Sequence, residues 1–258
     1  MNRIKSDSRF RPASKAAGIH LFCSLALAIL AALVVLGLWY PYPYRELSGG
    51  RELFLLMVGV DVVCGPLLTF VLFNPAKPRR ELWLDLGLVA LLQLLALCYG
   101  IWTAWQARPV YLAMEVDRFK VVMSADIDHE ALKPLPVELQ PLPFGGVRTV
   151  ALRRPVSVEE KNGVLFEAIE GGRDYAERPE FYVPYKGAAA MATLQRAKPL
   201  EPFFQKYPER LSEAEDLARV KNSKLIDWRF LPVVGRQDWV ALLDGDGHIQ
   251  GFLRGDGF

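Results

Sequence analysis

Apolar residues gather in three long runs within the first 105 residues, whereas the rest of the 258-residue chain mixes apolar and polar positions. The runs cover residues 16–40, 53–73 and 82–105. At about 1.5 Å of rise per residue, each run is long enough as a helix to cross a hydrocarbon layer of about 30 Å. The pattern predicts a three-helix transmembrane bundle, followed by an exported α+β domain at residues 106–258.

The first run is expected to stay in the membrane as an anchor. The apolar region of a cleaved signal peptide is only about 7–15 residues long and is followed by a small-residue cleavage site. This run is longer, and it ends in the aromatic stretch Trp39-Tyr-Pro-Tyr-Pro-Tyr44, which is typical of a membrane interface.

The distribution of Lys and Arg predicts the orientation of the spans. Only Arg45 and Arg51 lie between the first and second spans. Eight basic residues lie before the first span or between the second and third, namely Arg3, Lys5, Arg9, Arg11, Lys15, Lys77, Arg79 and Arg80. Because such residues favour the cytoplasmic side, residues 1–15 are expected in the cytoplasm. Three spans then export the C-terminal domain, to the periplasm if the cell is a Gram-negative bacterium.

Charge and cysteine content narrow the classes of function. Residues 1–105 carry ten Lys and Arg against six Asp and Glu, and the remainder carries 21 against 23. A slightly acidic exported domain lacks the basic surface of a nucleic-acid-binding protein. Cys23, Cys64 and Cys98 all lie in the predicted spans, so the exported domain is expected to fold on a hydrophobic core without a disulfide.

Local patterns predict the elements of the exported domain. Residues 110–116 and 119–122 read as a pair of strands, and residues 228–234, 239–243 and 249–253 as a meander. Helices are expected to open near Ser157 and Ser212, and another within residues 187–197. Four prolines in residues 133–143 predict an extended surface segment.

Four polar residues inside the predicted spans need an explanation, because polar groups in hydrocarbon are costly. They are His20, Asp61, Asp85 and Gln93. Counting the rise along each helix puts Asp61 level with Gln93, and His20 near the level of Asp85. We expect Asp61–Gln93 and His20–Asp85 contacts that fix the packing of the spans. The alternative is that one of these residues engages the helix of a partner.

The same count argues against an intramembrane aspartyl peptidase. Asp61 and Asp85 differ in depth by about 12 Å, whereas a shared-proton pair needs carboxylates about 3 Å apart. For Gly65-Pro66, a kink that serves packing is favoured over a moving hinge. Arg79 and Arg80 have two readings, topology alone or contact with an acidic partner.

Other candidate chemistry is weak. Asp244-Gly-Asp-Gly247 has two alternating carboxylates, but an EF-type calcium loop would need a carboxylate at its twelfth position, where Gly255 stands. A hairpin turn is the favoured interpretation. The sequence contains no recognisable catalytic motif, so we expect a protein that is not an enzyme and has no cofactor or metal. A membrane sensor or an unrecognised membrane enzyme acting on an envelope substrate is the alternative.

Several strings taken together resemble the TfpX/TfpZ family of type IV pilin accessory proteins. The resemblance covers residues 15–125 well and is looser beyond them. The strings include Ala16-Ala-Gly-Ile-His20, Leu47-Ser-Gly-Gly50, Gly59-Val-Asp-Val-Val-Cys-Gly-Pro-Leu-Leu-Thr69, Ala90-Leu-Leu-Gln-Leu94, Gln106-Ala-Arg-Pro-Val110, Glu115-Val-Asp-Arg-Phe119 and Gly235-Arg-Gln-Asp-Trp239.

The resemblance implies an inner-membrane chaperone or assembly factor that affects the stability, assembly or display of one type IV pilin. Pilin waits in the membrane as a single helix with its head outside and a glutamate near the cytoplasmic face. The expected partner-binding residues are Asp61, Gln93, His20, Asp85, Arg79 and Arg80. The family brings no catalytic residue or cofactor. Its expected partners are pilin, possible further pilus components and membrane lipid.

Overall fold

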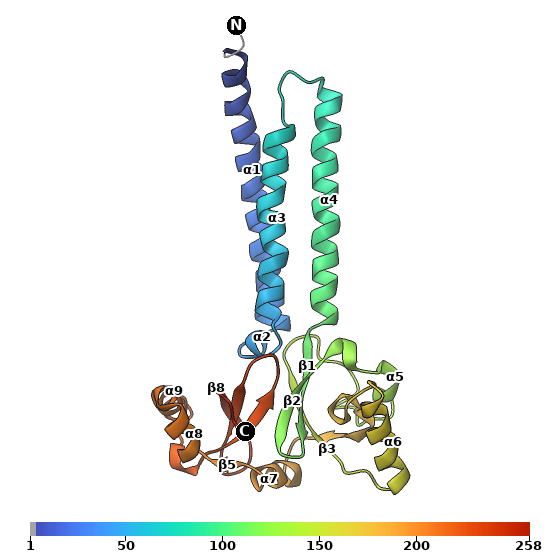
Figure 1. Cartoon of the computed structure of the whole chain (residues 1–258), viewed down its shortest axis with the longest axis vertical. Coiled ribbons are helices and arrows are strands. Elements are labelled where there is room, and N and C mark those ends of the chain that lie inside the picture. Colours follow the sequence, from blue (N-terminus) through green and yellow to red (C-terminus); the bar gives the residue numbers. More distant parts are fainter. Residues whose placement is uncertain (1–3) are drawn as a thin grey trace. The chain divides into compact units, whose positions relative to one another are not determined.

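The chain, seen here in a computed structural model, divides into two compact units (Figure 1). The structure describes residues 4–258, with side chains from residue 9 onward, so Arg3 and the side chain of Lys5 in the basic N-terminus lie outside the described residues. One unit contains the long N-terminal helices up to Leu38 and from Gly50 to Gln106. The other contains residues 39–49 together with residues 107–258.

The three apolar runs form three helices, as predicted. They are α1 (Ile4–Val34), which continues as a π-helical turn at Val35–Trp39, α3 (Gly50–Leu72) and α4 (Arg79–Gln106). Each is long and apolar enough to cross a membrane. Most of their large apolar side chains are exposed, which is the arrangement expected of helices whose surroundings are lipid.

Helix α3 packs along both α1 and α4. At the end of α3, the Arg9 guanidinium donates hydrogen bonds to the main-chain carbonyls of Val71 and Phe73, the latter at 3.2 Å. The last carbonyls of a helix have no partner within the helix, so a cation at this end satisfies them and favours the helix dipole. One residue of the basic N-terminus therefore has a structural role that the sequence did not reveal.

The second unit is built on a mixed eight-stranded sheet with the order β4-β3-β1-β2-β6-β7-β8, and β5 also pairs with β6. The strands are β1 (Pro109–Glu115), β2 (Arg118–Met123), β3 (Arg148–Leu152), β4 (Tyr182–Pro184), β5 (Lys198–Pro199), β6 (Arg229–Val234), β7 (Trp239–Leu243) and β8 (Ile249–Arg254). The predicted β1–β2 pair and the β6–β7–β8 meander are confirmed. Parallel pairing of β1 with β3 and of β2 with β6 was not predicted.

Residues 107–258 also contain five α-helices. They are α5 (His129–Leu132), α6 (Val158–Ile169), α7 (Ala188–Leu194), α8 (Glu201–Lys206) and α9 (Leu211–Val220). As predicted, Ser157 caps α6, its hydroxyl accepting the Glu160 N–H at 3.1 Å. The helix predicted near Ser212 is confirmed as α9, but Ser212 does not cap it. A 3₁₀ turn at Pro208–Arg210 leads directly into α9, so the chain is already helical when it reaches that serine.

The proline-rich segment at residues 133–143 is not extended, which corrects the prediction. It folds into successive turns, in which the Leu135 N–H donates to the Leu132 carbonyl and the Leu139 N–H to the Pro136 carbonyl. Leu132, Leu135 and Leu139 are all buried in the core beside Tyr111. Proline fixes φ near a turn value, and burial of the intervening leucines stabilises the turns.

The short loop between α1 and α3 is part of the sheet domain. It carries α2 (Tyr44–Leu47), in which Leu47 is fully buried among β2, β6 and β7 side chains. The Arg236 N–H donates to the Leu47 carbonyl at 2.6 Å, and a Cβ on Gly235 would lie 2.7 Å from that carbonyl oxygen. Tyr42 meets the Trp239 ring edge to face. This packing requires residues 39–49 and 107–258 to lie on the same side of any membrane the helices cross.

Candidate functional site

Several polar residues of the helical unit, but not Asp85, line a cavity of about 190 Å³ that is bounded by α1, α3 and α4. Helix α1 contributes His20, Cys23 and Ser24 to its lining, α3 contributes Asp61, and α4 contributes Gln93. The remaining lining is apolar. The cavity is therefore a small, mainly apolar notch to which a few polar side chains contribute.

Gln93 and Asp61 form the predicted contact, but the Gln93 side chain bonds the main chain of Asp61 and not its carboxylate. The Gln93 amide donates to the main-chain carbonyl of Asp61 at 2.8 Å. Pro66 lies one turn further along α3, where it lacks an N–H and disturbs the helix hydrogen bonds before it. The carbonyl that loses its helical donor to Pro66 is that of Val62, so the Gln93 amide bonds the carbonyl next to it rather than the freed one. Gly65 leaves the space, because a Cβ there would collide with the Gln93 side chain.

The Asp61 carboxylate is left open by this arrangement. Its side chain is only half-buried and lines the cavity. Among the residues that the structure describes, none donates a hydrogen bond to this carboxylate and none forms an ion pair with it. A carboxylate at this depth ordinarily faces a partner group or water, so the notch contains an unused acceptor.

The predicted His20–Asp85 contact is wrong. The His20 ring nitrogen Nδ1 lies 2.5 Å from the Thr69 hydroxyl on α3, and Lys77 donates to the Asp85 carboxylate at 2.5 Å. Depth along the helix was estimated well, since His20 does meet a residue at its own level. The direction in which the side chains face was not predicted correctly, because α3 packs against α1 at that level and presents Thr69 to His20.

Arg79 and Arg80 open α4 and are both exposed. Within the described part of the chain, neither takes part in a salt bridge. Two cations at a helix N-terminus are unfavourable for the helix dipole, so local helix stability does not explain them. Their position fits both predicted roles, topology and contact with an acidic group.

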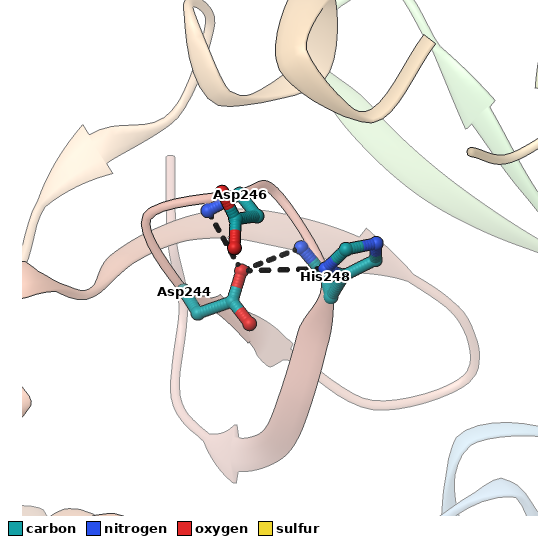
Figure 2. A group of neighbouring side chains, drawn as sticks. All are labelled: Asp244, Asp246 and His248. Atoms are coloured by element: carbon teal, nitrogen blue, oxygen red, sulfur yellow. Dashed lines mark hydrogen bonds and ion pairs between the residues drawn. The ribbon is translucent and has the colours of Figure 1, made fainter. Parts of the chain in front are cut away.

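The acidic turn at Asp244 is structural. Its carboxylate oxygen Oδ1 accepts the main-chain N–H groups of Asp246 and His248, each at 2.9 Å (Figure 2). Oδ2 accepts from the Gln250 amide at 2.5 Å. Asp244, Asp246 and His248 lie close enough to suggest a cation site. However, the Asp244 carboxylate is already used by the hairpin between β7 and β8, so the predicted turn is confirmed.

Ionisable side chains of the sheet domain meet around Lys120 on β2. Its ammonium group donates to Asp174 and to Glu177, the latter at 2.8 Å. Burial raises the pKa of Glu115, although the Lys120 charge opposes that rise. Burial and the Glu177 charge likewise raise the pKa of Asp126. The cluster joins β1 and β2 to the 3₁₀ turn at Tyr175–Glu177, and it provides a structural ion-pair network.

Three helices that are long and apolar enough to cross a membrane, followed by a sheet domain, indicate a membrane protein with a large additional domain. The sequence comparisons give the family. The profile of the family described as "Fimbrial assembly protein FimB" matches residues 8–49. A fimbrial assembly protein of serogroup I from Dichelobacter nodosus is 34% identical over 256 residues, covering 98% of this chain and 99% of that protein. The chain belongs to this family of fimbrial assembly proteins.

Further relatives come from the same organism. The serogroup E1 fimbrial assembly protein is 33% identical over 256 residues, again across nearly both full lengths. The protein of serogroups C1 and C2 is 43% identical over 122 residues, which cover 47% of this chain and 93% of that protein. No solved structure matches.

Sequence reasoning missed several residues of the site. Ser24 and Cys23 line the notch from α1, and Thr69 and Lys77 are the true partners of His20 and Asp85. The signal for Thr69 was present, because the helical rise puts it at the level of His20. No comparable signal marks Ser24, since small residues are common in membrane helices for packing alone.

Proposed function

We propose that this chain is an inner-membrane assembly factor for type IV fimbriae that holds a pilin subunit before its assembly. Its near full-length likeness to fimbrial assembly proteins of D. nodosus supports the fimbrial role. The more specific reading, a TfpX/TfpZ-type accessory protein that serves one pilin, rests on the resemblance of residues 15–125. In this role the chain acts by binding and carries out no chemical step.

The observation that carries the proposal is the open Asp61 carboxylate in the notch between α1, α3 and α4. An ionisable side chain near the centre of a membrane helix costs about 2.5–3.5 kcal/mol on insertion scales. A partner helix that supplies a hydrogen-bond donor removes part of that cost on binding. Asp61 then favours the bound state specifically.

The size of the notch favours a helix over a small molecule. About 190 Å³ is below the roughly 300–1,000 Å³ of typical ligand pockets. It fits instead one side chain projecting from a helix that lies across the three spans. Ser24, Ala28 and Ala90 line the notch and let a neighbouring backbone approach closely.

Pilin suits this site at two levels. Its single membrane helix would lie against the notch, and its external head would lie near the sheet domain. The exposed cations of Arg79 and Arg80 would face the glutamate of the pilin helix near the cytoplasmic side. In this arrangement His20 and Gln93 act indirectly, since they hold α3 in place beside the notch.

The orientation that the proposal needs is N-terminus inside and sheet domain in the periplasm. The distribution of Lys and Arg supports this direction. The packing of residues 39–49 into the sheet domain supports it further, because the sparsely charged loop and the large domain must share one side.

Asp61→Leu tests the proposal, with Asp85→Asn as a matched control. Asp85 is also an aspartate of the helical unit, but Lys77 already pairs with it. Pilin recovered with the tagged chain after crosslinking in cells and mild detergent extraction is expected to fall about tenfold or more in Asp61→Leu. Asp85→Asn is expected to keep pilin at the wild-type level.

Surface fimbriae should fall together with the recovered pilin. If Asp61→Leu accumulates in the membrane normally and still recovers pilin and fimbriae at wild-type levels, the notch does not hold pilin. If another envelope protein is recovered in place of pilin from the wild-type chain, the sensor or enzyme alternative replaces the proposal.

A further inference from the structure

Helix α6 (Val158–Ile169) is amphipathic, but its apolar face points outward. None of its twelve residues, all of which the structure describes, is buried. Val158, Leu165 and Ile169 are 67%, 52% and 71% exposed, and Phe166 beside them is 60% exposed. Spacings of seven and four residues put Val158, Leu165 and Ile169 on one face of the helix. We call this set of four side chains the α6 apolar face.

The opposite, acidic face of α6 attaches the helix to the sheet domain. Glu160 accepts two hydrogen bonds from the Arg153 guanidinium, at 2.8 and 3.2 Å. Glu167 pairs with Arg178 and lies 3.6 Å from Arg173. The hydrogen bond from Arg153 lowers the pKa of Glu160, and the one from Arg178 lowers the pKa of Glu167. Ion pairs at two points along the helix therefore determine which face turns inward.

The charges beside the α6 apolar face are uneven. Glu159 and Glu170 are three turns apart and lie along the same flank of the helix, both exposed. Lys161 lies on the other flank. A membrane-surface helix would need Lys and Arg beside its apolar face to meet anionic lipid. The acidic flank of α6 is unfavourable for that use.

A second copy of the chain is also disfavoured as the occupant. When two α6 helices pack face to face in antiparallel fashion, the same flank of each helix meets itself. Glu159 and Glu170 of one copy would then lie beside the same carboxylates of the other, and like charges at such spacing destabilise a helix pair. In a parallel pair the two carboxylates would face only Lys161 of the other copy, one cation for two acidic groups, so a partner that offers more basic side chains is the better match.

We propose that the α6 apolar face is a docking surface for an amphipathic helix of another protein, with basic side chains bordering the apolar stripe of that helix. The docked helix covers Leu165, Phe166 and Ile169, and its Lys or Arg side chains meet Glu159 and Glu170. This is the helix-against-apolar-face mode of recognition. The surface belongs to the sheet domain and is independent of the intramembrane notch.

Photocrosslinking in cells tests the proposal on the full-length chain. Benzoylphenylalanine is introduced in place of Leu165 or Ile169, and in place of Val220 as the control. Val220 is 81% exposed on α9, so it reports the crosslinking of an ordinary exposed apolar site. We expect protein adducts from residues 165 and 169 above the control yield. Mass spectrometry should place them on an amphipathic helix with Lys or Arg beside its apolar stripe.

Charge reversal then tests the partner's chemistry. Glu159→Lys/Glu170→Lys is expected to lower the adduct yield about fivefold or more. The matched variant Glu201→Lys/Glu215→Lys, which reverses two exposed carboxylates on α8 and α9, should leave the yield unchanged. Both variants alter exposed side chains, and unchanged thermal unfolding verifies that the fold is kept.

Four results would overturn the proposal. These are adducts only between two copies of the chain, adducts only with lipid, a yield at residues 165 and 169 no higher than at Val220, and protein adducts that survive the Glu159→Lys/Glu170→Lys reversal undiminished.

Discussion

A protein surface normally matches the chemistry of its surroundings. The intramembrane notch and the α6 apolar face both depart from that rule, in opposite directions. In the helical unit, where the surroundings are expected to be lipid, the open group is the Asp61 carboxylate. In the sheet domain, where the surroundings are expected to be water, the exposed group is the cluster of apolar side chains on α6. Each surface exposes the chemistry that its own solvent disfavours.

The difference teaches where to look for partners in a membrane protein. An exposed leucine on α4 is ordinary for a helix that is expected to face lipid. The same exposure on α6 is informative, because α6 belongs to the sheet domain. Apolar side chains that gather on a surface facing water mark an interaction site. Conversely, an open carboxylate on the domain surface is unremarkable, whereas at Asp61 it marks a site.

The largest expected effect concerns Leu47, an apolar side chain that is already buried in the sheet domain, in contrast to the exposed apolar side chains of α6. Leu47→Ala removes a fully buried side chain, so the free energy of unfolding of the sheet domain should fall by about 2–5 kcal/mol. Val137→Ala, at an exposed position, should change it by less than about 0.5 kcal/mol. Denaturant titration of the purified full-length chain measures both. Equal effects would mean that residues 39–49 are not part of the domain core.

Helices α6 and α9 give an intermediate test of the comparison. Leu217 on α9 packs over Gly251 of β8, so Leu217→Ser should lower the unfolding free energy by about 1–3 kcal/mol. Leu165→Ser on α6 should change it by less than about 0.5 kcal/mol, because that side chain is exposed. A large loss in Leu165→Ser would show that α6 packs its apolar face inward after all.

The smallest expected effect concerns Glu115, a carboxyl group of the sheet domain whose burial is partly offset by the charge of Lys120. Burial raises the pKa of Glu115 above its ordinary value of 4.5. A raised carboxyl pKa means that ionised Glu115 costs stability above that pKa, and that the cost vanishes as pH falls toward 4.5. Glu115→Gln should therefore raise the unfolding temperature at pH 7 and have no effect below pH 4.5. Calorimetry across this range measures it, and a difference independent of pH would contradict the assignment.

Much of the fold follows from local sequence. Three long apolar runs, the strand pair from Pro109 to Met123 and the C-terminal meander are each set by periodicity and turn residues close in the chain. The parallel pairings of β1 with β3 and β2 with β6 are not, because they join strands separated by long connections. The burial of Leu47 was not predicted, because it too depends on contacts with residues far away in the chain. Leu47 and Arg236 each lie in a string that marks the family resemblance, but the strings do not show that the two residues meet.

The site was predictable in depth but not in facing. The helical rise brings Gln93 level with Asp61 and His20 level with Thr69, and both contacts form. It does not reveal that α3 packs between its two neighbours, so the wrong partner was expected for His20. The outward face of α6 likewise depends on ion pairs with Arg153 and Arg178, which lie just outside the helix on either side and which helical periodicity does not reveal.

The most direct test of the central claim uses the chain's own cysteines. Cys23 lines the notch, whereas Cys98, also exposed on the helical unit, is not among the described residues that line it. Chains keeping only Cys23 or only Cys98 are expressed with pilin variants carrying single cysteines along the membrane helix, and mild oxidation is applied. Cys23 should form a disulfide with pilin at one helical position and its neighbours one turn away, and Cys98 should not. No pilin disulfide from Cys23, or equal yields from both cysteines, would contradict the account.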